Sequence, residues 1–407
     1  MKGLAFAAAA LAFVSQAAEA KTLKVSPSAD AQEALQTALL DAKPGDVVRL
    51  AAGRYVLVDG LSLDVDDVTV RGAGPDKTVL SFSGQKGAGE GLLVTSNRVT
   101  VRDLAVEDTK GDGIKAKGVD QISFVNLRVE WTGGPKETNG AYGVYPVSST
   151  NVLIDKVMVK GASDAGIYVG QSKNIVLKRS DAEFNVAGIE IENSMNADVF
   201  ENVATHNAGG ILVFDLPGLP QMGGHSTRVF NNKVVQNDTP NFAPKGNIVA
   251  GVPTGTGVMV MANRDVHVFA NEIDENQSAA VMLVAYQQPF DDANYDPLPR
   301  QIVVRDNKIG RNGWNPQFPG GADLAAAAGG MLPPVLWDGV TVDPRSGESP
   351  EGAGQMMLSD GPVMNLNLPA PSEMERARPE VTPTLGSGPL PEPPAVSLPP
   401  AQAALGS

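Results

Sequence analysis

The chain has 407 residues, no Cys and a formal net charge of −14 at pH 7. The absence of Cys excludes disulfides, thiolate metal sites and c-type haem attachment. The acidic balance argues against nucleic acid and anionic membranes as partners. It argues less strongly against polyanionic sugars, because a local cationic cleft can outweigh the net charge.

Residues 1–20 predict a secretory signal peptide. Lys2 supplies the positive start, residues 4–14 form an apolar run, and residues 18–20 (AEA) form a small-x-small cleavage site. The apolar run is too short to span a bilayer, and no later stretch approaches the roughly twenty apolar residues that a span needs. The mature protein is therefore expected to begin near Lys21, to be periplasmic or secreted, and not to insert into a membrane.

Residues 21–46 predict an N-terminal strand and a short capping helix. Asp30 and Glu33 have the spacing of a capping box, and Ala31, Leu35 and Leu39 form one apolar stripe. The helix is expected to stop at residues 43–45 (KPG) and to cover the open end of the strands that follow.

Residues 47–315 predict an all-β solenoid, a single-stranded right-handed parallel β-helix. A small residue followed by an aliphatic one recurs with steps of 22, 30, 23, 22, 22, 47 and 23 residues, at positions 91, 113, 143, 166, 188, 210, 257 and 280. A fixed period of this length indicates stacked structural repeats. The longest step covers about two periods and marks an insertion.

Apolar residues alternate inside each repeat. Ile167 and Val169 are followed by Ile175 and Leu177. Three short strands separated by Asn, Gly, Asp and Ser turns fit one triangular coil, whereas helical repeats would need a period of 3.6. Asn side chains at matching turns are expected to stack as a ladder that satisfies their amides; these are Asn151, Asn174 and Asn196.

The C-terminal quarter has no such period. Residues 316–368 predict an irregular segment, and residues 369–407 predict a Pro-rich disordered tail. The alternative for the tail is a Pro-rich segment that binds a partner.

The alternation also predicts which side chains point outward, because the residue after each inward aliphatic faces solvent. Successive coils then present a strip that runs from cationic through aromatic and anionic to apolar. The first part supplies the catalytic candidates Lys115, Lys117, Tyr145, Tyr168, Glu190 and Glu192. The apolar part begins at Leu212 and Phe214 and continues at Met259 and Met261.

One hypothesis for this strip is uronan lyase or epimerase chemistry. Removing a proton beside a carboxylate needs a base, here Tyr or Lys, and a cation that neutralises the substrate acid. Calcium is a candidate cofactor, because Asp164, Glu190 and Glu192 are oxygen ligands from neighbouring coils. Against this hypothesis, the strip has no Arg, and the Asp-Pro-His-Asp signature of related epimerases is absent.

A second hypothesis is glycoside hydrolysis. Glu190 and Glu192 lie two residues apart on one strand, so their Cα atoms are roughly 6.6 Å apart, near the carboxylate separations that glycosidases use. The structural alternative for all these residues is a solvated solenoid face with ion pairs between coils.

The insertion between Gly210 and Gly257 is the main candidate for a binding region, since insertions in solenoids often form the binding face. Residues 215–224 and 240–253 are rich in Pro and apolar residues, which suggests ordered walls. An apolar platform there would suit a sugar ring or a protein partner. The substrate- or partner-binding candidates are Trp131, Phe214, Asp215, Phe242, Met259 and Met261.

Residues 61–312 resemble a bacterial family of exported right-handed parallel β-helix repeat proteins of the pectate-lyase-like superfamily. The matching segments are 108–112 (DTKGD), 131–134 (WTGG), 140–147 (GAYGVYPV), 163–171 (SDAGIYVGQ), 188–193 (GIEIEN), 209–217 (GGILVFDLP) and 239–247 (TPNFAPKGN). The resemblance implies the fold and export, and it implies no particular activity. It also implies an exported partner that resembles a c-type cytochrome.

Two functions of different classes therefore stay open. The first is a protein that binds or modifies a polysaccharide through the strip from Lys115 to Glu192. The second is a non-catalytic periplasmic interaction protein that docks the exported c-type-cytochrome-like partner through its Pro-rich loops and apolar strip.

Overall fold

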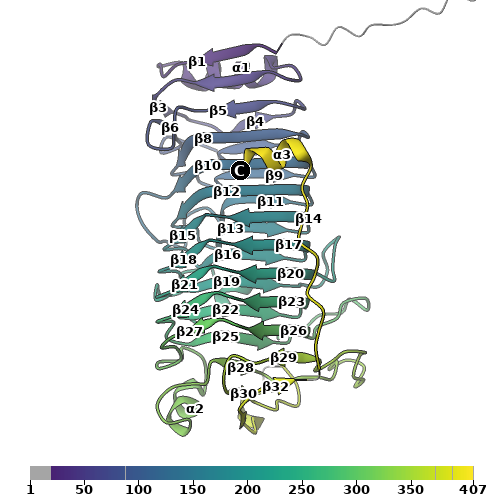
Figure 1. Cartoon of the computed structure of the whole chain (residues 1–407). Helices are drawn as coiled ribbons and strands as arrows, with labels where there is room; N and C mark the ends of the chain where they lie inside the picture. The colour runs from purple at the N-terminus through teal and green to yellow at the C-terminus, as the bar shows by residue number, and fades with distance from the viewer. Residues whose placement is uncertain (1–19, 88, 372, 387, 407) are drawn as a thin grey trace, which may run out of the picture.

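The protein is an elongated stack of parallel β-strands (Figure 1). The computed structural model describes residues 20–87, 89–371, 373–386 and 388–406. All but the last residue of the expected signal peptide lies outside this part of the chain. Within it, the strands form one 20-stranded and one 12-stranded sheet, named sheet A and sheet B below.

Sheet B carries the outward strip and gains one strand from each coil. Its pairs are parallel up to the last one, in which β30 and β31 are antiparallel. Its strands are β4 (Leu61–Leu63), β7 (Leu92–Val94), β9 (Ile114–Lys117), β11 (Tyr142–Val147), β13 (Ala165–Gly170), β16 (Ala187–Glu192), β19 (Gly209–Phe214), β22 (Thr256–Met261), β25 (Ala279–Val284), β28 (Val335–Trp337), β30 (Val363–Asn365) and β31 (Glu380–Thr382).

Sheet A turns a corner and so supplies the other two faces of the triangular coil. The long strand β12 shows this, because its first half pairs with β14 and its second half pairs with β15. The strands of sheet A are β1 (Thr22–Val25), β2 (Val47–Leu50), β3 (Gly53–Val56), β5 (Thr69–Arg71), β6 (Thr78–Ser81), β8 (Val99–Glu107), β10 (Asp120–Glu130), β12 (Thr150–Lys160), β14 (Lys173–Lys178), β15 (Asp181–Glu183), β17 (Met195–Phe200), β18 (Val203–Thr205), β20 (His225–Phe230), β21 (Lys233–Val235), β23 (Arg264–Phe269), β24 (Glu272–Asp274), β26 (Arg300–Arg305), β27 (Lys308–Ile309), β29 (Met356–Leu358) and β32 (Leu385–Gly386).

Short helices lie at the ends and in the loops. The helix α1 (Ala31–Asp41) packs against β1, β3 and β4 and buries Ala31, Leu35 and Leu39. The expected capping box does not form, because Asp30 makes no side-chain hydrogen bond at the N-terminus of α1. The other helices are η1 (Ile248–Gly251), α2 (Gly321–Ala327), η2 (Met374–Arg376) and α3 (Pro400–Leu405).

The core is a column of aliphatic side chains in strict register. Ile167 pairs with Ile189, which pairs with Ile211 on the next coil, and all three side chains are fully buried. Burial of such side chains stabilises the stack by about 1.5–3 kcal/mol each. The repeat in the sequence is therefore the repeat of the core.

The predicted Asn ladder is confirmed. Asn174 donates to the Oδ1 atom of Asn151 at 3.2 Å, and Asn196 donates to Asn174 at 3.3 Å. Two longer ladders are buried at other turns of the described residues, and their amides also satisfy backbone groups. They contain Asn202, Asn232, Asn271 and Asn307 in one, and Asn185, Asn207, Asn237, Asn276 and Asn312 in the other.

The prediction that the stack ends at residue 315 is wrong. Sheet B continues through β28 and β30, and sheet A continues through β29, all in parallel pairing. Residues 285–299 and 310–334 separate these late strands, so their spacing departs from the 22–23-residue period. The long loops hid these coils from a search for a fixed period.

The prediction of a disordered tail is also wrong for its described residues. The tail runs along the side of the stack and ends in α3 beside β10 (Figure 1). Gln402 donates to the carbonyls of Ile122 and Asn151, both at 2.8 Å, and the carbonyl of Gly406 accepts from Arg179 at 2.6 Å. The composition indicates that the segment cannot form a core of its own. In the structure it packs against the surface of the stack instead.

Candidate functional site

The outward strip exists as predicted, in register along sheet B. One column begins with Lys115 and continues through Tyr145, Tyr168 and Glu190. It then passes through the apolar side chains Leu212, Met259, Met282, Leu336 and Met364. Parallel strands are about 4.8 Å apart, so the polar and apolar halves meet directly.

A second column places Glu192 beside Phe214, which pairs in turn with Met261. Lys117 begins this column, but Val147 and Gly170 separate it from Glu192. Lys117 is exposed. Of the two candidate lysines, the structure therefore brings only Lys115 to the aromatic side chains.

Three tyrosines form a compact cluster at the polar half. The ring centroids of Tyr142 and Tyr168 are 4.4 Å apart, those of Tyr142 and Tyr145 are 4.5 Å apart, and those of Tyr145 and Tyr168 are 4.9 Å apart. Sequence reasoning missed Tyr142, because it lies at the start of its strand, outside the alternation. Its membership in the family-like segment 140–147 was the available signal.

Lys115 lies at the edge of the tyrosine cluster, with its Nζ atom 4.7 Å from the centre of the Tyr145 ring. The same atom forms ion pairs with Glu90 at 3.0 Å and Asp112 at 3.4 Å. Burial lowers the pKa of Lys115, but the hydrogen bond to Glu90 and the charge of Asp112 outweigh it and raise the pKa. Lys115 is therefore a charged group that two acids already neutralise.

Three buried carboxyl groups lie next to the tyrosines. The hydroxyl of Tyr168 donates to Glu192 Oε1 at 2.5 Å, and Asn247 Nδ2 donates to Asp164 Oδ2 at 2.9 Å. Burial is the main cause that raises the pKa of Asp164 and of Glu192, each to about 7. Burial, followed by the charge of Glu192, raises the pKa of Glu190 well above its ordinary value.

The phenol groups are poor candidates for a base. Burial raises the pKa of Tyr168 well above its ordinary value, and the charge of Glu192 adds to this effect. The pKa values of Tyr142 and Tyr145 are raised mainly by burial as well. The prediction of a Tyr or Lys base therefore does not fit this environment, whereas protonated carboxyl groups near neutral pH fit the role of proton donors.

The predicted calcium set does not fit a metal ion either. No group of three or more His, Cys, Asp or Glu side chains in the described part of the chain is arranged to hold one. Asp164 already accepts a hydrogen bond from Asn247, and Glu192 accepts one from Tyr168.

Loops cover much of the strip and change the roles expected for several binding candidates. Phe214 is 1% exposed, and Phe242 is half-buried in the same apolar cluster. Asp215 is buried and accepts hydrogen bonds from the backbone of Gly223 and Gly224 at 3.0 and 2.8 Å. Burial raises its pKa to about 6 despite those bonds. These side chains shape the loops instead of presenting a free docking surface.

Trp131 was also predicted to bind a substrate or partner, and the structure places it elsewhere. It is 5% exposed, belongs to the main core, and donates from Nε1 to the carbonyl of Thr109 at 2.7 Å. Met259 and Met261, in contrast, line a pocket of about 420 Å³ at the apolar half of the strip.

The fold agrees with the comparison to protein families. A family model described as a right handed beta helix region matches residues 82–251. The stacked coils give the chain the fold of a parallel β-helix, and the match to a right-handed model agrees with it over residues 82–251. No curated protein sequence matches the chain. In the described residues, no helix has the length and hydropathy to cross a bilayer.

Several solved β-helix structures are similar to this chain in fold. The A-module of the Azotobacter vinelandii mannuronan C-5 epimerase AlgE6 is 17% identical, with a TM-score of 0.48 over 76% of this chain and 86% of that chain. The alginate lyase from Paenibacillus sp. str. FPU-7 is 17% identical, with a TM-score of 0.35 over 72% and 97%. The GH136 lacto-N-biosidase from Eubacterium ramulus is 14% identical, with a TM-score of 0.47 over 71% and 68%.

Proposed function

We propose that the protein binds a polysaccharide at the polar half of the strip and modifies it with Glu192 as proton donor. The observation that carries this proposal is the Tyr168–Glu192 hydrogen bond of 2.5 Å inside a cluster of buried carboxyl groups. A carboxyl group with a pKa of about 7 is protonated for part of the time at neutral pH, as a general acid must be.

The tyrosine cluster supports a carbohydrate ligand. Tyr142 and Tyr145 are half-buried, so each ring keeps part of its surface available. Sugar rings stack on such amphipathic aromatic surfaces, while the phenol hydroxyls hydrogen-bond to sugar hydroxyls. The buried Oε2 atom of Glu190 has no hydrogen-bond partner in the described part of the chain, and such an exception supports a functional role for this cluster.

The charges favour a neutral sugar over a uronan. Lys115 is the cation nearest the tyrosines, and its two ion pairs with Glu90 and Asp112 already neutralise it. A uronate would also approach the carboxyl groups of Asp164 and Glu192, which repel it when they ionise. Cleavage assisted by an acid therefore fits the site better than elimination by a Tyr or Lys base.

The proposal is tested with a panel of neutral and uronate polysaccharides, in which reducing ends and unsaturated ends are measured separately. We expect reducing ends without unsaturated ends. Glu192→Gln should lower kcat at least about 100-fold, the usual contribution of a general acid. Glu137→Gln, at an exposed turn, is the matched control and should keep full activity. Unsaturated ends as the main product would contradict the proton-donor role. If no product forms and no polysaccharide binds, the proposal as a whole is contradicted.

The docking of a c-type-cytochrome-like partner stays an expectation from the family resemblance. Phe214 cannot carry it as a surface residue, since its side chain is 1% exposed. Co-purification of the exported partner with the wild-type chain, and its absence with a chain that lacks the 240–253 loop, would support that role.

A further inference from the structure

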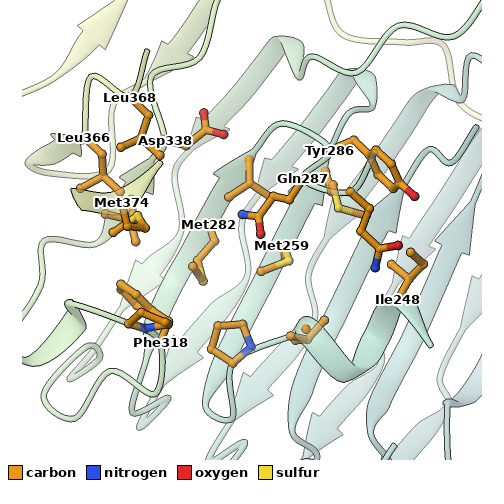
Figure 2. Close-up of a pocket in the computed structure, with 18 of the residues that line it drawn as sticks. Ile248, Met259, Met282, Tyr286, Gln287, Phe318, Asp338, Leu366, Leu368 and Met374 are labelled. Carbon is orange, nitrogen blue, oxygen red and sulfur yellow. The ribbon is translucent and has the colours of Figure 1, made fainter. Parts of the chain in front are cut away.

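The apolar half of the strip forms the floor of a pocket of about 420 Å³. Met259 and Met282 lie side by side on adjacent strands β22 and β25, and Met261 follows on β22. Residues outside the strands form the walls, among them Ile248, Tyr286, Phe318 and Met374, which Figure 2 shows around the side chains of Met259 and Met282. The volume lies within the range of about 300–1,000 Å³ that is typical of ligand sites and far exceeds a packing defect.

The lining chemistry argues against an anionic ligand inside the pocket. No lining residue is Lys, Arg or His. Asp338 accepts hydrogen bonds from the backbone of Ala285 at 2.6 Å and Val340 at 3.0 Å, so its carboxyl group is used by the fold. The remaining polar side chains are Tyr286, Gln287, Gln288 and Glu375. Met side chains are flexible and polarisable, so they adapt to apolar ligands of irregular shape.

The pocket adjoins the proposed catalytic group. Phe214 lines the pocket and lies in register between Glu192 on one side and Met261 on the other. Glu192 is also close to Tyr286, a lining residue of the pocket. Burial is the larger cause that raises the pKa of the Tyr286 phenol, and the charge of Glu192 raises it further. One molecule could therefore occupy the apolar pocket and reach the tyrosine and carboxyl clusters with its polar end.

We infer that the pocket binds an alkyl or acyl chain carried by the carbohydrate, which makes the ligand an amphipathic, acylated or lipid-linked sugar. This inference rests on the proposed function for the position of the sugar. The pocket itself is argued from its own lining, so the two are tested separately.

The test uses isothermal titration of the full chain with 1-decanol, decyl maltoside below its critical micelle concentration, and maltose. We expect saturable binding of decanol and decyl maltoside. Met282→Glu should weaken decanol binding at least tenfold, because it places a charge on the pocket floor. Met282→Leu should keep binding within about threefold, because it conserves volume and polarity.

Two further variants make the result decisive. Met259→Trp narrows the pocket by adding bulk to its floor without a charge, and it should also weaken decanol binding. The inference therefore stays testable even if Met282→Glu has a folding defect. Met158→Glu, on sheet A away from the pocket, is the matched control and should bind like wild type. No saturable decanol binding, or binding that Met282→Glu and Met259→Trp leave unchanged, overturns the inference.

The two proposals fail in different ways. Decanol binding that persists in Glu192→Gln, while no polysaccharide or glycoside is modified, supports the pocket and removes the proposed function. Polysaccharide modification without decanol binding supports the function and overturns the acyl-chain pocket.

Discussion

Glu192 shows how one buried side chain combines a role in function with a cost in stability. Its carboxyl group is 7% exposed and close to two other acids, and its hydrogen-bond donor is Tyr168. Burial raises its pKa from 4.5 to about 7. Burial of an ionisable carboxyl group destabilises the fold when the group ionises. Replacing Glu192 with an uncharged side chain should reverse that effect.

Glu192→Gln should therefore stabilise the protein above pH 7. Between pH 4.5 and 7 the unfolded chain ionises Glu192 while the folded chain keeps it protonated, so folding stability falls as pH rises through this window. The amide has no such penalty, and the variant should gain on the order of 2 kcal/mol at pH 8 and nothing near pH 4. Thermal unfolding followed by circular dichroism at both pH values measures this, with Glu137→Gln as control. A variant that is less stable than wild type at pH 8 would contradict the assignment.

Tyr168→Phe probes the hydrogen bond itself. The bond from the Tyr168 hydroxyl lowers the pKa of Glu192 against the larger effect of burial. Without the hydroxyl, the pKa should rise further, and the alkaline limb of the activity profile should move to higher pH. A profile measured from pH 5 to 9 tests this, and a shift toward lower pH would show that Tyr168 does not act through Glu192.

At the scale of elements, the Asn ladders determine how tightly the turns stack. The amide of Asn207 donates to the carbonyls of Ala182 and Thr205, and its oxygen accepts from Asn185. The side chain is fully buried. If it were removed, its hydrogen-bond partners would stay buried without a partner and without access to water.

Asn207→Ala should lower the free energy of unfolding by about 2–4 kcal/mol, since each buried unsatisfied group costs about 1–3 kcal/mol. Asn196→Gly is the control. Asn196 belongs to the exposed ladder, and glycine accepts its φ of 59°, so the loss should stay below about 1 kcal/mol. Urea unfolding of both variants measures the difference, and equal losses would mean that burial of the ladder contributes nothing.

For the whole molecule, the tail acts as a strap across the coils. Glu392 pairs with Arg305 of β26 at 2.6 Å and with Arg228 of β20 at 2.8 Å, while α3 reaches β10. Between these points, Val396, Leu398 and Leu405 cover an outward apolar patch formed by Val125, Leu153, Val176 and Phe200. In a solenoid each coil otherwise contacts only its neighbours, so the strap adds contacts between distant coils.

Deleting residues 388–407 should expose this patch and weaken the stack. We expect the thermal unfolding temperature to fall by at least about 3 °C, which corresponds to roughly 2–3 kcal/mol for a protein of this size. Binding of a hydrophobic dye should rise at the same time. Gln402→Ala, which removes only the two hydrogen bonds to β10 and β12, should give a smaller decrease. An unchanged unfolding temperature after the deletion would show that the tail binds without stabilising the stack.

The sequence by itself determined the coil, its period and the order of side chains along the outward strip. Each of these depends on local alternation and on a repeat of 22–23 residues. Such patterns can be recognised in the sequence without any information on distant contacts. The positions of Lys115, Tyr145, Tyr168 and Glu190 in one column follow from that register alone.

The tertiary structure decided what those side chains can do. Glu190 and Phe214 are buried, Trp131 belongs to the main core, and loops that follow no period help to form the pocket around Met282. Burial in turn raises the pKa values that favour proton donors over a Tyr base. Burial and electrostatic interactions depend on segments that are distant in sequence. The repeat pattern alone therefore does not predict them.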